Sequence, residues 1–386
     1  MEDQAMKTIK SEKSRDGGDS HTATALLKWY DNAKRDLPWR RTSDPYAIWL
    51  SEIMLQQTQV KTVIPYYRSF LTEFPTVVRL ADAQLDQVYN VWQGLGYYSR
   101  ARRLWEGAKY LVETNRGELP QTYAELIEIP GVGDYTAGAI ASIAFGEKVG
   151  AVDGNVKRVM ARLLGWTGPI EKADALKAFK SRIKEWQPED RAGDFNQGLI
   201  ELGATVCTPK KARCAECPLR RDCLALEKKL VADLPVVQRR QKQMTVVRLL
   251  FVIRKGKQIY LQKRAEQGLL AGLWEIPGVD IQSLQEIEKG DLFAFYRKAV
   301  QSRTNDQEIS LLLQRTLPIY GPVWHIFSHR RWQMFWLVLD LEAEKVGKRE
   351  EIRERSSLYG DQRYVSLEGL NEVALPVAFS EIIRSI

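Results

Sequence analysis

The chain has 386 residues, 44% of them hydrophobic, which is enough for sizeable cores in two or three domains. Its 57 Lys and Arg outnumber 49 Asp and Glu, and the net charge of +8 favours a polyanionic partner such as nucleic acid. No apolar run approaches the ~18 residues of a transmembrane helix, so we expect no membrane partner and a cytoplasmic location.

Residues 1–22 are polar and charged, without the apolar centre of a secretion signal or a membrane anchor. We expect them to form a disordered tail.

Residues 23–230 are predicted to be helical, because apolar residues recur every three or four positions between short connections marked by Gly or Pro. One helix opens at Asp44-Pro45 and carries Glu52 within an apolar run. A solvent-facing Glu is the more common case. If Glu52 is buried, its pKa rises and it can hold a proton near neutral pH.

Two turns carry side chains that could fill a gap in a disrupted duplex. The turn at residues 56–59 is rich in amides, and Gly94-Leu95-Gly96-Tyr97-Tyr98 offers exposed aromatics that can replace a lost base. Local turn structure and core packing are the alternatives.

The segment 129–133, Ile-Pro-Gly-Val-Gly, cannot continue a helix, because Pro130 lacks an N–H and both glycines can take positive φ. Asp134 can cap the helix that follows. Two helices then meet at a hairpin whose free N–H groups suit a phosphate, although a plain connection is possible.

Asp153 lies further along, at the start of the next amphipathic helix. An N-cap is the ordinary role for such a residue, and catalysis is the alternative.

All four cysteines fall within residues 207–223, with basic residues between them. Such close spacing in a cytosolic chain indicates a metal centre, either zinc or a cubane iron–sulfur cluster, rather than disulfides. The metal would pin a basic loop that can meet phosphates.

After a basic linker at 231–245, the chain becomes a mixed α and β domain, with strands predicted at 246–253, 258–263 and 332–341. Residues 268–278 resemble the loop that leads into a Nudix box. Leu284 stands where the box needs Glu, and the acidic run is absent, so this domain should bind rather than catalyse. The loop 325–331 offers a hydroxyl, two imidazoles and two cations, although an ordinary surface loop is possible.

From about Ala23 to its end, the chain resembles the adenine DNA glycosylases, which share the helix-hairpin-helix glycosylase superfamily with the endonuclease III-like enzymes. The latter carry a nucleophilic lysine where this chain has Tyr135, and usually Gln in place of Glu52. The Phe-Ser-His loop also favours the adenine branch. The resemblance implies a multidomain fold: an all-α helix-hairpin-helix domain at 23–230 with its hairpin near 122–145, and an α+β Nudix-like domain at 246–386.

The resemblance also implies a role for each matching residue. Glu52 would be the general acid and Asp153 the carboxylate beneath the sugar, supported by Tyr135 and Asn155. Trp39, Arg40, Leu55 and Gln197 would line the adenine pocket. Gln57 and Tyr97 would wedge the duplex, while Thr58, Leu95 and the loop of Phe327, Ser328 and His329 would face the oxidised guanine. Gly131, Val132 and Gly133 would grip phosphate. Cys207, Cys214, Cys217 and Cys223 would hold one [4Fe–4S] cluster in preference to zinc.

The implied activity is that of a monomeric, monofunctional glycosylase. It would hydrolyse the N-glycosidic bond of adenine mispaired with 8-oxoguanine or guanine in double-stranded DNA. For this chemistry we expect the two carboxyl groups to differ, with the Glu52 pKa raised by apolar neighbours and Asp153 kept ionised by N–H groups. The alternatives are a bifunctional glycosylase/lyase and a non-catalytic iron–sulfur DNA-binding protein.

Overall fold

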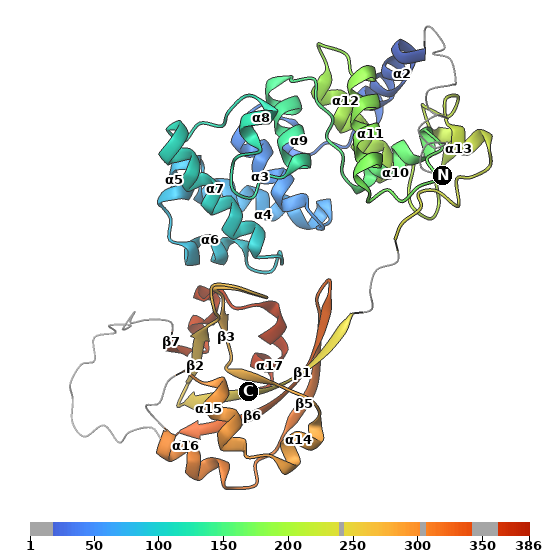
Figure 1. Cartoon of the computed structure of the whole chain (residues 1–386). Coiled ribbons are helices and arrows are strands. Elements are labelled where there is room, and N and C mark those ends of the chain that lie inside the picture. The colour runs from blue at the N-terminus through green and yellow to red at the C-terminus, as the bar shows by residue number, and fades with distance from the viewer. Residues whose placement is uncertain (1–17, 239–242, 302–305, 342–361) are drawn as a thin grey trace. The chain divides into compact units, whose positions relative to one another are not determined.

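The structure, a computed structural model, describes residues 18–238, 243–301, 306–341 and 362–386 (Figure 1). Contacts divide the chain into two units, one made of residues 1–82 and 103–239 and the other of 83–102 and 240–386. Most of the expected N-terminal tail, residues 1–17, lies outside the described residues. Residues 18–22, which the sequence assigned to this tail, belong to the first helix.

The prediction of a helical segment over residues 23–230 is confirmed. Its elements are α2 (Gly18–Ala33), η1 (Pro38–Arg40), α3 (Pro45–Leu55), α4 (Val60–Glu73), α5 (Val77–Asp82), α6 (Leu85–Trp92), α7 (Ser99–Asn115), α8 (Tyr123–Leu126), α9 (Asp134–Phe145), α10 (Gly154–Leu163), α11 (Ala173–Trp186), α12 (Ala192–Thr205), η2 (Cys214–Glu216) and α13 (Leu224–Glu227). Within the described residues, none of these helices is long and apolar enough to cross a membrane.

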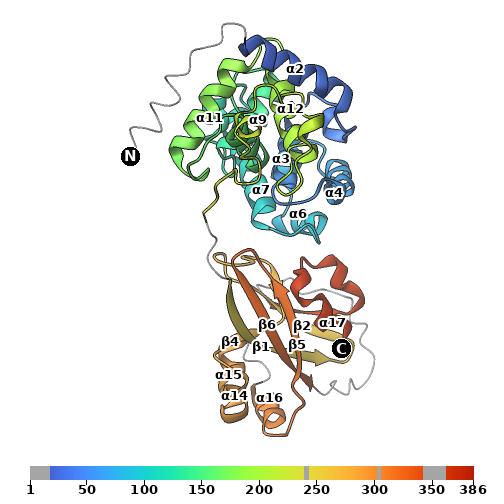
Figure 2. The same cartoon turned by 90° about the vertical axis from the view of Figure 1, so that its right-hand side faces the viewer.

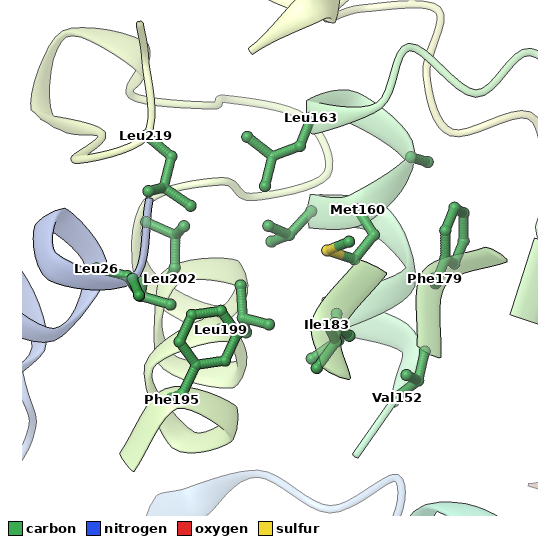
Figure 3. Packing of buried hydrophobic residues seen from close by; sticks show 14 of the residues in the cluster. Leu26, Val152, Met160, Leu163, Phe179, Ile183, Phe195, Leu199, Leu202 and Leu219 are labelled. Carbon is green, nitrogen blue, oxygen red and sulfur yellow. The ribbon is translucent and has the colours of Figure 1, made fainter. Parts of the chain in front are cut away.

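One core of the helical unit lies where α2, α10, α11 and α12 meet (Figure 3). Leu26, Met160, Phe179 and Leu199 are among its fully buried members. Helix α12 also packs against α9. It comes so close to α10 that a Cβ on Gly203 would lie 2.7 Å from the Cβ of Asn155. The glycine therefore lets α12 approach the N-terminal end of α10, where the candidate site lies.

The second unit is built on a seven-stranded sheet with strand order β3-β2-β1-β6-β5, in which β4 also pairs with β1 and β7 with β2. The strands are β1 (Met244–Lys255), β2 (Gln258–Lys263), β3 (Trp274–Glu275), β4 (Gly278–Ile281), β5 (Tyr320–Ile326), β6 (Arg330–Leu341) and β7 (Gln362–Ser366). The three predicted strands correspond to β1, β2 and β6. The central pair, β1 and β6, is parallel and runs from Met244 opposite Arg330 to Lys255 opposite Leu341.

Helices cover both faces of this sheet, with α17 (Ser380–Arg384) on one side and α15 (Leu292–Ala299) and α16 (Asp306–Leu313) on the other (Figure 2). Alternate residues of β6 contribute to the two cores. Trp332 and Met334 pack with Phe379 of η4 (Val377–Phe379) and with α17. Leu337 and its alternate neighbours pack instead with α15 and α16. The remaining short helices are α14 (Leu284–Lys289) and η3 (Glu368–Glu372). The expected α+β architecture is confirmed.

Candidate active site and metal centre

A cavity of about 670 Å³ in the helical unit contains both candidate carboxylates. Most of the site residues that the sequence placed in this unit line it: Trp39, Arg40, Glu52, Leu55, Gln57, Thr58, Gly131, Gly133, Tyr135, Asp153, Asn155 and Gln197. The side chain of Val132, in the same hairpin as Gly131 and Gly133, is buried and does not line the cavity. The volume falls within the range of pockets that enclose small ligands.

Glu52 lies near the C-terminal end of α3, which begins as predicted with Asp44 at the N-cap and Pro45 in the first turn. The residue is 7% exposed, so it is buried rather than solvent-facing. Its Oε2 accepts a hydrogen bond of 2.6 Å from the Tyr135 hydroxyl. Burial raises the pKa of Glu52 to about 7; Asp153 adds to this rise, while Tyr135 and Arg40 oppose it. Glu52 can therefore hold a proton near neutral pH.

Asp153 is both the N-cap of α10 and part of the cavity wall. Its carboxylate accepts hydrogen bonds from the Val156 amide at 2.7 Å and the Asn155 side chain at 2.9 Å. Burial nevertheless raises the pKa of Asp153, and these hydrogen bonds only oppose the rise. The expected N–H donors are present and lower the pKa of Asp153, but desolvation outweighs them, so the net shift is upward.

Asn155 and Arg158 connect Asp153 to the cysteine-containing loop at 207–223. Arg158 donates a hydrogen bond to Asn155 Oδ1 at 2.9 Å and another to the carbonyl of Cys207 at 2.8 Å. Asn155 is thus held between the carboxylate and a guanidinium, which fixes the amide that supports Asp153.

Trp39 and Arg40 lie on η1 at one wall of the cavity. The Arg40 guanidinium donates to Glu201 Oε2 at 2.8 Å, and Arg35 donates to the same carboxylate. Glu201 and Arg35 were not predicted as site residues from the sequence. The available signal was a charged residue, Glu201, at a position of α12 where its neighbours Leu199 and Leu202 are apolar and buried.

The hairpin differs in detail from its prediction. Gly131 has φ +82°, whereas Gly133 has φ −94° and is itself the N-cap of α9. Asp134 is therefore not the cap. Its carboxylate bonds instead to the Tyr123 hydroxyl and the Lys180 ammonium. Both glycines are exposed, as a phosphate contact requires.

The two wedge candidates share an unusual backbone. Gln57 has φ +58° and Tyr97 has φ +50°, and both side chains are exposed. Non-glycine residues in this region are uncommon and cluster at functional sites. Leu95, in contrast, has a buried side chain and does not present it to a base in this structure.

The loop between β5 and β6 carries the residues expected to read the guanine. Phe327 is half-buried, with its ring 4.9 Å from that of Trp332. Ser328 and His329 are exposed, and the Ser328 hydroxyl lies 3.2 Å from His329 Nδ1. Phe327 thus anchors the loop, and the two polar residues face solvent.

The four cysteines are half-buried free thiols that line a second cavity in the helical unit. Arg162 donates to Cys207 Sγ at 3.2 Å and to the carbonyls of Thr208, Pro209 and Leu234. Across the described ranges, no group of three or more His, Cys, Asp or Glu side chains is arranged to hold a single metal ion.

Two family models match different parts of the chain. The family model for HhH-GPD superfamily base excision DNA repair proteins matches residues 50–185, and the model for the NUDIX domain matches residues 249–385. A solved thermostable thymine-DNA glycosylase is 29% identical, with a TM-score of 0.52, over 56% of this chain and all of that one.

Curated relatives match most of the chain. It is 37% identical to the adenine DNA glycosylase of Homo sapiens, over 82% of this chain and 66% of the human protein. The mouse enzyme is 36% identical, over 82% of this chain and 70% of its own length. The enzyme of Buchnera aphidicola subsp. Baizongia pistaciae is 35% identical, over 78% and 85%. With its helix-hairpin-helix and Nudix-like parts both matched, the chain belongs to the adenine DNA glycosylase family.

Proposed function

We propose that this protein is a monofunctional DNA glycosylase that hydrolyses the N-glycosidic bond of adenine mispaired with 8-oxoguanine or guanine. The observation that carries the proposal is that Glu52 and Asp153 line one cavity large enough for a nucleoside. Membership of the adenine DNA glycosylase family supports the reaction.

Glu52 supplies the proton. With a pKa near 7, its carboxyl group is substantially protonated at neutral pH, and it donates to N7 of adenine as the bond from N9 to C1′ breaks. The Tyr135 hydroxyl occupies Oε2, which leaves the other carboxyl oxygen for the base. Protonation turns a poor leaving group into neutral adenine.

Asp153 stabilises the electron-poor sugar. Bond cleavage creates an oxocarbenium-like cation, and a nearby positive charge favours the ionised form of the Asp153 carboxyl group. The Val156 amide and Asn155 hold that carboxylate in place. Water then adds to C1′ and returns a proton to Glu52, so the cycle closes without a covalent lysine adduct.

The remaining residues bring the substrate into the cavity. A paired adenine is inaccessible, so the nucleotide must leave the duplex. Trp39, Arg40, Leu55 and Gln197 line the pocket that receives the base. Gln57 and Tyr97 wedge the duplex, while Thr58, Ser328 and His329 face the opposite guanine. Phe327 anchors the loop that carries Ser328 and His329, and the buried Leu95 side chain is not part of this set. The hairpin of Gly131, Val132 and Gly133, in which the two glycines are exposed and the Val132 side chain is buried, binds phosphate nearby.

Cys207, Cys214, Cys217 and Cys223 would hold a [4Fe–4S] cluster. The residues fit such a group, because all four thiols line one cavity and Arg162 braces Cys207. When bound, the cluster supplies four iron–thiolate bonds that fix the loop at 207–223. We further propose that the protein acts as a monomer in the cytoplasm, with a catalytic domain at 23–230 and a guanine-reading domain at 246–386.

The test is single-turnover excision from duplexes that contain A:8-oxoguanine, A:G or A:C, with a visible absorption spectrum of the same preparation. We expect fast release of adenine from the first two and slow release from A:C. Equal rates on all three would contradict the mispair specificity, and the absence of base release would contradict the glycosylase assignment.

A further inference from the structure

An ion cluster of one buried carboxylate and two arginines lies at the wall of the base pocket; Arg40 is 10% exposed and Arg35 is 40% exposed. Glu201 of α12 has no exposed side-chain surface. Its Oε1 accepts from Arg35 Nε at 2.6 Å, and its Oε2 accepts from Nη2 of Arg35 and of Arg40, each at 2.8 Å. A buried carboxylate is unfavourable unless it is paired, and this one has three charge-assisted hydrogen bonds.

Arg35 and Arg40 both line the cavity that Glu52 also lines. The Arg40 side chain is 10% exposed, and its guanidinium lies over the Tyr30 ring at 5.5 Å. Glu201 and Tyr30 together therefore limit where Arg40 can point. A carboxylate that engages both guanidinium groups fixes their position relative to the cavity.

One charge of this cluster, that of Arg40, acts directly on Glu52. The charged or titratable groups that face Glu52 are Tyr135 from α9, Asp153 ahead of α10 and Arg40 from η1. Among these, Arg40 is a cation that lowers the pKa of Glu52 and so works against protonation. Glu201 places a negative charge directly on that cation, which reduces its net effect.

We propose that Glu201 is a positioning residue that holds Arg35 and Arg40 at the base pocket and offsets their charge, so that Glu52 stays protonated at neutral pH. The proposal rests on the glycosylase function above, because Glu52 must then act as the acid. Two cations and one anion leave the cluster with one net positive charge, and each substitution below changes that balance in a known direction.

The experiment measures single-turnover adenine excision against pH for the wild type, Glu201→Gln and Arg35→Gln. Glu201→Gln leaves two uncompensated cations, so the alkaline limb of the profile should move to lower pH, by about one unit. Arg35→Gln leaves a neutral pair, so the same limb should move to higher pH. Loosened packing would shift both variants in one direction. Shifts of the same sign, or no shift in either variant, would overturn the proposal.

Two control variants and a folding check keep the outcomes distinct. Glu189→Gln removes an equal charge from an exposed pair with Lys148 and should leave the limb in place. Glu201→Asp keeps the charge but shortens the side chain, so its limb should match the wild type while its rate falls. If thermal melting shows that Glu201→Gln does not fold, Arg35→Gln and Glu201→Asp decide the question, and an unmoved Arg35→Gln limb overturns it. A wild type without excision at any pH would instead refute the glycosylase function.

Discussion

The Tyr135 hydroxyl donates a 2.6 Å hydrogen bond to Glu52 Oε2, joining the start of α9 to the end of α3 inside one cavity. The Tyr135 hydroxyl donor and the Glu52 carboxyl acceptor satisfy each other. The bond orients the carboxyl group that carries the proton in the proposed mechanism. It also places a hydroxyl, rather than an amine, beside the place that we propose for the sugar.

Replacement of Glu52 by Gln should remove the acid while it preserves the size of the side chain. We expect base release to fall by at least about 100-fold, because a positioned acid contributes a factor of roughly 10² to 10⁴. Mismatch binding should stay close to that of the wild type. Single-turnover excision and gel-shift titration measure the two effects, and near-normal excision would refute the role of Glu52.

The stability of the protein should depend on pH through Glu52. Its folded pKa of about 7 lies above the ordinary value of 4.5, so its favourable contribution is complete below 4.5 and is lost as pH rises through 7. Glu52→Gln does not ionise. Relative to the wild type, it should therefore gain roughly 2–3 kcal/mol in free energy of unfolding between pH 5 and pH 8. Urea unfolding at several pH values measures this difference, and parallel stability curves would contradict it.

The wild type should lack strong strand-nicking activity, since Tyr135 cannot form a Schiff base with the sugar. Borohydride should trap little covalent DNA adduct, although another lysine can support weak trapping. Tyr135→Lys should increase trapping, and Tyr135→Phe serves as the control that removes the hydroxyl without adding an amine. Efficient trapping of the wild type would favour the bifunctional alternative.

Substitution of the exposed loop residues should reduce the preference for 8-oxoguanine. We expect Ser328→Ala combined with His329→Ala to lower the ratio of affinities for A:8-oxoguanine and A:G duplexes, because both side chains face solvent beside the anchored Phe327. Ser283→Ala, at another exposed position of the same unit, is the matched control. An unchanged ratio in the double variant would exclude this loop from guanine discrimination.

Much of the fold followed from local patterns. The helical segment and the start of α3 were predictable because apolar periodicity and the Asp44-Pro45 pair act within a few residues. Strands β3, β4, β5 and β7 were not predicted. The first two have only 2 and 4 residues, and they form where the longer strands β2 and β1 offer partners.

The site shows the same division. Glu52 and Asp153 were identified from motif and position, whereas their burial depends on how α3, α9 and α10 pack. This is why the raised pKa of Asp153 was missed: the donors at a helix N-terminus are visible in sequence, but desolvation is not. The N-cap of α9 was misassigned for a related reason, because Asp134 finds partners in Tyr123 and Lys180, which lie elsewhere in the chain.

The parallel pairing of β1 with β6 has a consequence for biosynthesis. Strand β1, which begins at Met244, can pair only after strand β6, which begins at Arg330, has been synthesised. Sequence-distant contacts of this kind form slowly and leave apolar strands uncovered meanwhile. A chain truncated between the end of α13 and the start of β6 would keep its helical elements but lack the central strand pair of the sheet, and we expect quality-control proteases to degrade it.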